Sequence, residues 1–192
     1  MPDAPETRLS FHPTAIGGVF EVERHPRADH RGRFARLFCA EEYAAAGLFA
    51  GGAVQINLAT TTRAGSVRGM HHQQVRPDGS GEAKLVTCVV GRVFDVALDV
   101  RVGSPTFGRH HAVELAGDGT TSLLIPPGVA HGMQALEDDV TLLYVHGAAY
   151  DPALERGVRP DDPALAIGWP LPVVALSDRD RALPDLAALE TR

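Results

Sequence analysis

The 192-residue chain is poor in lysine, cysteine and aromatic residues, and it has no long apolar run. Its net charge is −6 with neutral histidine, and it has no basic tract, which argues against a nucleic-acid partner. No stretch approaches the roughly 18 apolar residues of a membrane helix, and the amino terminus lacks the apolar segment of a signal peptide. We therefore expect a cytoplasmic protein with no membrane partner.

The two cysteines, Cys39 and Cys88, lack the spacing of metal ligands and are expected to be reduced thiols. Lysine is scarcer still, because Lys84 is the only lysine among 18 basic side chains. Lysine is a compact ammonium on a flexible stem, whereas arginine is a planar fork. Lys84 is therefore a candidate for chemistry that needs a point donor, and the alternative is a surface lysine without a function.

Short apolar runs rich in β-branched residues recur between turn residues, and the chain holds 20 glycines and 14 prolines. This pattern predicts an all-β single domain over residues 1–192, an antiparallel sandwich or barrel with a few short peripheral helices. We expect helices at 41–50, ended by Gly51 and Gly52, and within the last ten residues, where 186–192 form a tail. The expected strands include residues 17–23, 53–61, 84–91, 92–100, 110–116, 121–126 and 140–147.

The segment RGMHHQ carries three side chains of chemical interest, Arg68, His71 and His72. Strand side chains alternate, so only one of the two histidines is expected to face the interior. Arg68 and His71 would also point to opposite faces unless Gly69 marks a β-bulge. Adjacent histidines do not form the same-face pair that would join His131 around a metal ion, which disfavours a metal site. The alternative is a surface Arg68 and a core His71.

Two further segments carry polar candidates. Tyr144 shares a strand face with Leu142 and His146, so it is either a core aromatic with a hydrogen-bonded hydroxyl or an acid that faces a site. The segment LSDRD places Arg179 and Asp180 among other charges, a pattern that by itself is typical of a solvated turn.

The segment PPGVAHG resembles the second motif of the cupin superfamily, whose members are small jelly-roll barrels. From about Gly17 to Asp185 the chain is similar to the dTDP-4-dehydrorhamnose 3,5-epimerase family. The resemblance implies a cupin jelly-roll homodimer without metal or other cofactor. Such enzymes invert carbons beside the keto group of a 4-keto-6-deoxy sugar nucleotide. The segments that carry it, in order, are RGMHHQ, EAKLVTCVVGRVFDVALDVR, SPTFG, IPPGVAHGM, LLYVHGAAYDP, DDPALAIGWP and LSDRD.

The resemblance implies that His71 is the base, Asp180 its partner, Tyr144 the acid and Lys84 the cation near the keto oxygen. These residue types suit the chemistry, because a preorganised donor stabilises an enolate and a histidine titrates near neutral pH. The family's dimers exchange amino-terminal strands, so some binding residues are expected from the partner subunit. The positions implied for substrate binding are Arg31, Gln55, Asn57, Arg68, His131, Tyr150, Glu155 and Arg179, with Tyr150 stacked on the nucleobase.

The chain departs from the family pattern at His72, Val129, Met133 and residues 160–162. Arg36 also stands where the best-known members carry a glutamate that contacts the nucleotide. The expected substrate is a nucleotide-diphosphate sugar, most simply one linked to dTDP. Two alternatives remain open: a metal-dependent cupin isomerase or oxygenase, and a catalytically silent jelly roll that binds a nucleotide sugar.

Overall fold

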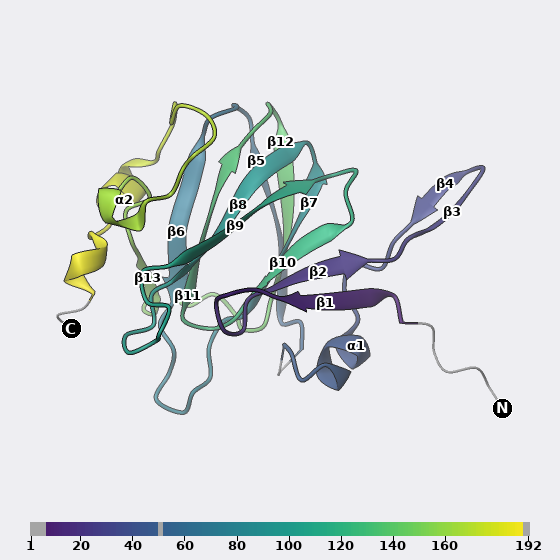
Figure 1. The fold of residues 1–192 in the computed structure, drawn as a ribbon, viewed down its shortest axis with the longest axis horizontal. Helices are drawn as coiled ribbons and strands as arrows, with labels where there is room; N and C mark the ends of the chain where they lie inside the picture. Colours follow the sequence, from purple (N-terminus) through teal and green to yellow (C-terminus); the bar gives the residue numbers. More distant parts are fainter. Residues whose placement is uncertain (1–6, 50–51, 190–192) are drawn as a thin grey trace.

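A computed structural model describes residues 7–49 and 52–189 of the chain. Two antiparallel sheets face each other, and a small hairpin projects from them (Figure 1). None of the helices in these residues is long and apolar enough to span a bilayer. The elements are β1 (Leu9–Pro13), β2 (Phe20–Arg24), β3 (Arg27–Asp29), β4 (Gly32–Phe34), α1 (Ala40–Ala45), β5 (Gln55–Thr61), β6 (Val67–Gln73), β7 (Lys84–Val90), β8 (Arg92–Asp99), β9 (His110–Ala116), β10 (Thr121–Ile125), β11 (Val129–Ala135), β12 (Val140–His146), β13 (Glu155–Gly157), α2 (Asp178–Arg181) and the 3₁₀ turns η1 (Pro163–Leu165) and η2 (Leu186–Ala188).

The six-stranded sheet has the order β1-β2-β10-β7-β12-β5, and the five-stranded sheet has the order β13-β6-β11-β8-β9. Neighbours in space are mostly distant in sequence, as in a jelly roll, and every pairing between these strands is antiparallel. The predicted all-β class is therefore confirmed. The expected strands also appear, because alternating apolar residues let each strand cover one face of a core.

The core has three parts that follow from this alternation. The first lies between the sheets and includes Val86, Cys88 and Leu142. The second joins the outer face of the six-stranded sheet to α1 through residues such as Leu85 and Tyr43. The third covers the outer face of the five-stranded sheet with the carboxyl-terminal segment. Strand β11 is buried along its whole length because it has core on both faces.

The first predicted helix is shorter than expected, and the second is a 3₁₀ turn. Helix α1 ends at Ala45 rather than at the glycines 51 and 52, because Gly47 with φ of 71° reverses the chain. Phe49 then packs against Tyr43 in the second part of the core, and Gly51 lies outside the described residues. Near the carboxyl end, η2 is a 3₁₀ turn whose Leu186 packs on the third part of the core.

Strand β6 contains the β-bulge expected at Gly69. His71 pairs with His131 and Arg68 pairs with Met133, so two residues of β6 lie opposite one residue of β11. Gly69 has φ of 132°, and a Cβ atom there would lie 2.5 Å from the Cα of Gly132. Only glycine fits. The bulge turns Arg68 and His71 toward the same cavity.

Candidate active site

A cavity of about 900 Å³ lies between the two sheets and receives side chains from both. The six-stranded sheet contributes the first wall, the five-stranded sheet contributes the second, and α2 closes one side. A site of this size can hold a small organic ligand. The polar side chains discussed below that line it are Asn57, Arg68, His71, His72, Glu82, Lys84, His131, Tyr144, His146, Tyr150, Glu155, Arg179 and Asp180.

His71 and the buried Asp180 form a pair, with His71 Nε2 2.8 Å from Asp180 Oδ1. Ser177 caps α2 by accepting a hydrogen bond from the Asp180 amide, and the Gly69 amide donates to Asp180 Oδ2 at 3.3 Å. Burial opposes the charged carboxyl, but the hydrogen bond and charge of His71 hold the Asp180 pKa below its usual value. An ionised carboxylate only accepts, so Nε2 carries the proton and Nδ1 keeps its lone pair. The solvated-turn interpretation is wrong for Asp180, which is 4% exposed.

Lys84 is not a surface lysine, because only 11% of its side chain is exposed. It begins β7 and shares the inner face with Val86 and Cys88. Its Nζ donates to the His71 carbonyl at 3.1 Å and lies 3.2 Å from Glu82 Oε2. The ammonium therefore lies beside the candidate base, in a wall of the cavity.

Tyr144 lies on the inner face of β12 and packs on the first part of the core. Its ring contacts that of His131 edge to face, with centroids 5.6 Å apart, and stacks on that of His146 at 5.9 Å. Tyr144 also lines the cavity, and its hydroxyl makes no hydrogen bond with another of the described residues. Burial and the nearby Asp95 raise the Tyr144 pKa, so the hydroxyl stays protonated at neutral pH.

Two further carboxylate–histidine pairs border the cavity. His131 Nε2 lies 2.8 Å from Asp95 Oδ2, and His146 Nδ1 lies 2.8 Å from Glu82 Oε1. The sequence analysis had not selected Asp95, Glu82 or His146 as site residues. Two of them could have been found from strand alternation, because residues two apart share a face: Glu82 lies two residues before Lys84, and His146 lies two residues after Tyr144. Across the described residues, no three histidine, cysteine or acidic side chains are grouped to hold a metal ion.

The mouth of the cavity is formed by Tyr150, Glu155 and Arg179. The Tyr150 hydroxyl donates to Glu155 Oε2, and Arg179 pairs with Glu155 Oε1. Burial opposes the charged form of Glu155, but its bonds with Tyr150 and Arg179 keep its pKa below the usual range. Tyr150 is 51% exposed, so its ring is accessible to a ligand. Gln55 lies close by, where its Oε1 accepts from the Tyr150 amide at 3.2 Å.

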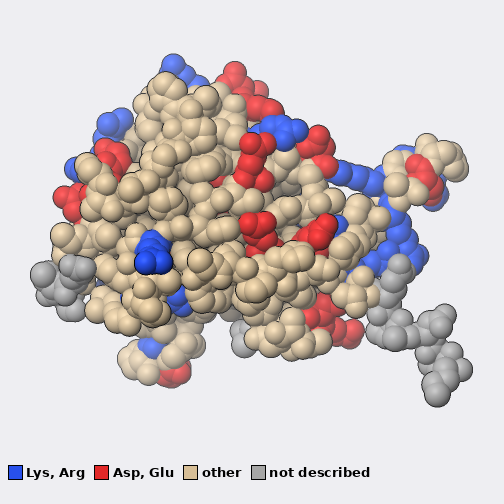
Figure 2. Space-filling model, viewed as in Figure 1, with Lys and Arg blue, Asp and Glu red and all other residues tan. Residues whose placement is uncertain are grey.

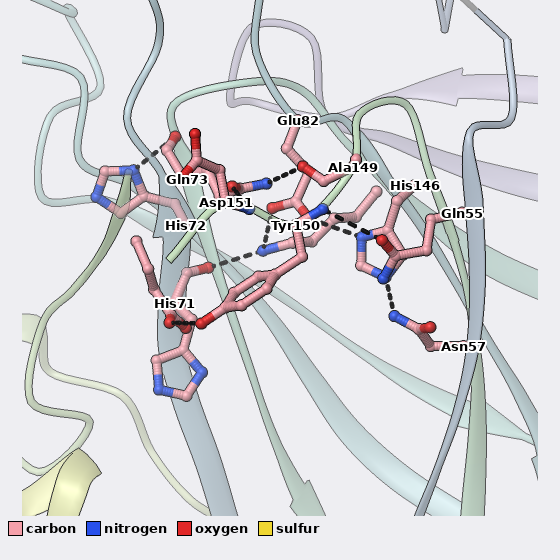
Figure 3. Close-up of polar contacts among 12 residues, drawn as sticks. Gln55, Asn57, His71, His72, Gln73, Glu82, His146, Ala149, Tyr150 and Asp151 are labelled. Atoms are coloured by element: carbon pink, nitrogen blue, oxygen red, sulfur yellow. Dashed lines mark hydrogen bonds and ion pairs between the residues drawn. The ribbon is translucent and has the colours of Figure 1, made fainter. Parts of the chain in front are cut away.

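The two histidines of β6 point apart (Figure 3). Their opposite directions agree with the alternation expected along the strand, although both residues border the cavity. The cavity extends along β6 to its end at Gln73, and His72 borders it there. His72 Nδ1 contacts the Gln73 carbonyl, while its buried Nε2 has no partner in the described residues. Burial lowers the His72 pKa to about 4.

Of three further predicted binding residues, two line the cavity and one does not. Asn57 lines the cavity, with Nδ2 3.3 Å from His146 Nε2. Arg68 also lines it, and its guanidinium donates to Thr61 Oγ1 at 2.8 Å. Arg31 does not lie in this cavity. It sits on the β3–β4 hairpin, which projects away from the sheets with basic side chains near its base (Figures 1 and 2), and it pairs there with Asp29.

Comparison with known proteins decides the family. The family model described as dTDP-4-dehydrorhamnose 3,5-epimerase matches residues 13–188. The chain belongs to this family. A dTDP-4-dehydrorhamnose 3-epimerase from Streptomyces niveus is 42% identical over 173 residues, which are 90% of this chain and 82% of that protein. A dTDP-4-dehydrorhamnose 3,5-epimerase from Mycolicibacterium smegmatis is also 42% identical, over 90% of this chain and 84% of that protein.

Solved structures of the family share the fold. NovW, a 4-keto-6-deoxy sugar epimerase from Streptomyces spheroides, superposes with a TM-score of 0.89 at 40% identity, covering 96% of this chain and 91% of that one. ChmJ, a 3′-monoepimerase from Streptomyces bikiniensis solved in complex with dTDP-quinovose, has a TM-score of 0.84 at 39% identity, with 94% and 89% covered. The relatives of the present chain are epimerases of dTDP-sugars, and the chain is an isomerase of this family.

Proposed function

We propose that this chain inverts C3, C5 or both of a dTDP-4-keto-6-deoxyhexose by proton transfer through an enolate. His71 Nδ1 takes the proton from the carbon beside the ketone, and the C–H electron pair forms the enolate double bond. The charge that develops on the oxygen is stabilised by the Lys84 ammonium. Tyr144 then delivers its hydroxyl proton to the other face of the carbon: the C=C electron pair of the enolate forms the new C–H bond, and an oxygen lone pair re-forms the carbonyl. Exchange with water restores both side chains.

The observation that carries this proposal is the position of the two proton-transfer groups on opposite walls. His71 stands on β6 of the five-stranded sheet and Tyr144 on β12 of the six-stranded sheet, and both line one cavity. Inversion requires proton removal from one face of the sugar ring and return to the other. A base and an acid on facing sheets meet this requirement, whereas a pair on one strand would return the proton to the face it left.

The protonation states support the same roles. Asp180 holds His71 with its proton on Nε2, so Nδ1 is the free base. Burial keeps Tyr144 protonated. A carbon beside a ketone becomes acidic only when a donor meets the developing oxyanion, and Lys84 is a buried point donor beside the base. No step requires a metal ion or another cofactor.

The dTDP-linked substrate is proposed from the relatives, one of which was solved with dTDP-quinovose. Tyr150 at the mouth would stack on the base, while Arg68 and Arg179 would meet the diphosphate. Arg36, where the best-known members carry a nucleotide-contacting glutamate, is engaged here with Glu42.

A homodimer with exchanged amino-terminal segments is part of the proposal. Arg31 cannot serve its own cavity from the projecting hairpin, but it could reach that of a partner subunit. Edge strand β5 also exposes apolar side chains, with Ile56 at 63% and Leu58 at 66%. Exposed apolar rows on a sheet edge are typical of interfaces. Light scattering during size-exclusion chromatography tests this, and a monomeric mass would refute it.

The decisive experiment is incubation with a dTDP-4-keto-6-deoxyhexose in heavy water, followed by NMR at C3 and C5. We expect deuterium at one or both carbons and none with His71→Ala. Absence of deuterium with the wild type, for several nucleotide bases, would refute the proposal. Loss of activity on chelation would favour the metal-dependent alternative, and tight binding without exchange would favour a silent binding protein.

A further inference from the structure

Glu82 and His146 link two predicted site residues into one hydrogen-bonded chain (Figure 3). Lys84 Nζ lies 3.2 Å from Glu82 Oε2, and Glu82 Oε1 lies 2.8 Å from His146 Nδ1. His146 Nε2 then lies 3.3 Å from Asn57 Nδ2. This hydrogen-bonded series thus runs along one wall of the cavity from the lysine to the asparagine.

The register of three neighbouring strands produces this arrangement. Lys84 of β7 pairs directly with His146 of β12, and β12 pairs with β5, which carries Asn57. Lys84 and His146 are opposite each other and share a face. Asn57 lies two residues from Gln55, the residue opposite His146, so it is the diagonal neighbour of His146 on that face. Glu82 lies just before β7 and reaches both partners, one with each oxygen.

The donors and acceptors of this hydrogen-bonded series have one consistent assignment. A carboxylate only accepts, so His146 donates from Nδ1 and keeps a lone pair on Nε2. That lone pair accepts a proton of the Asn57 amide, which fixes which end of the amide is the nitrogen. Burial opposes the charged form of Glu82, but the His146 hydrogen bond and the Lys84 charge hold its pKa below the usual value.

Because Glu82 and Lys84 are buried, their contacts determine how firmly the Lys84 ammonium is held. The side chains of Glu82 and Lys84 are 5% and 11% exposed, so water replaces their partners poorly. Without Glu82 the ammonium would keep only the His71 carbonyl as its partner among the described residues. It would then no longer be held in one place, and an oxyanion donor must be fixed before the charge develops.

We propose that Glu82 and His146 are a positioning pair: Glu82 holds the Lys84 ammonium where the enolate oxygen forms, and His146 orients the Asn57 amide toward the bound substrate. This inference rests on the proposed function. It assigns separate effects to the two residues, because Lys84 acts on the developing charge and Asn57 on the bound substrate. A residue with a merely structural role would lower stability and affect both kinetic constants together.

Two variants separate these roles. Glu82→Gln keeps an acceptor for His146 but loses the charge that holds Lys84, so kcat should fall by about tenfold or more, with KM within about threefold. His146→Asn keeps a donor near Glu82 but loses the acceptor for Asn57, so KM should rise by about fivefold while kcat stays within about threefold. Glu21→Gln is the matched control, because Glu21 bonds His111 at 2.9 Å outside the cavity, and it should change neither constant.

The readouts are initial rates with a dTDP-4-keto-6-deoxyhexose, thermal unfolding of each variant, and NMR of the wild type labelled with ¹³C-histidine. We expect His146 as the Nδ1–H tautomer, and thermal unfolding shows whether each variant is folded at the assay temperature. Kinetic constants of Glu82→Gln equal to those of the control, or a His146 Nε2–H tautomer, would overturn the inference while leaving the proposed function intact. If the wild type itself exchanges no deuterium, the proposed function fails, and the tautomer still tests the pair.

Discussion

Replacing Asp180 with asparagine should damage catalysis more than replacing it with alanine. The reason lies in the Gly69 amide, which donates to Asp180 Oδ2 at 3.3 Å. In Asp180→Asn, this N–H selects the side-chain oxygen, so the NH₂ group must face His71 Nε2. Nε2 is then forced to accept, and the proton moves to Nδ1, the atom that has to act as the base.

The size of the effect follows from two contributions. Turning the amide around would leave the Gly69 N–H facing a donor, and an unsatisfied buried group costs about 1–3 kcal/mol. Loss of the charged acceptor for the imidazolium removes about a further 1.5–3 kcal/mol. Together these are about 2.5–6 kcal/mol, which corresponds to a fall in kcat on the order of 10²–10⁴. The same substitution in the Ser-His-Asp triad costs about 10⁴ for the same tautomer reason.

Asp180→Ala holds neither tautomer, so part of the population keeps Nδ1 unprotonated. It avoids the amide penalty and should be faster than Asp180→Asn by about 5- to 150-fold. The assay is deuterium incorporation at C3 and C5 under single-turnover conditions, with the His71 tautomer read by ¹⁵N NMR. Equal or faster exchange in Asp180→Asn than in Asp180→Ala would refute the reasoning.

Three further predictions concern separate parts of the molecule. Lys84→Arg keeps the charge, but a planar fork cannot replace a buried point donor, so kcat should fall by about 10²-fold or more; near wild-type rates in the deuterium assay would contradict this. His72 stays neutral in the folded state down to a pKa of about 4, whereas the unfolded chain binds the proton below 6.5. The free energy of unfolding of the wild type should therefore be about 2 kcal/mol lower at pH 5 than at pH 7.5. Urea unfolding at these two pH values should show that His72→Phe, which has no proton to bind, loses about 2 kcal/mol less than the wild type over the same range. The fully buried Asp99 accepts hydrogen bonds from Arg101, Ser104 and Thr106, so Asp99→Asn should lower the free energy of unfolding by about 3–5 kcal/mol, and an unchanged denaturation midpoint would contradict this.

Much of the fold was predictable because it depends on local pattern. The β-branched runs between turn residues predicted the strands. The glycine between Arg68 and His71 only made a bulge available, and the structure shows that the bulge is present and that both side chains line one cavity. Helix ends were predicted less well. Gly47 ends α1, not the later pair of glycines, because the aromatic side chain of Phe49 returns to the core beside Tyr43.

Part of the candidate site was also predictable from the sequence, and part was not. The sequence by itself singled out Lys84 as the only lysine and placed Tyr144 on one strand face with His146, and the family resemblance joined the two in one site. It did not determine that Asp180 is buried, because LSDRD reads as a solvated turn until α2 packs beside β6 and meets His71. The partnership of Glu82 with His146, the distant position of Arg31 and the opposite walls of His71 and Tyr144 were likewise decided only by tertiary structure. The physical reason is that alternation along a strand is a local property, whereas strand order and register join residues that are far apart in the chain.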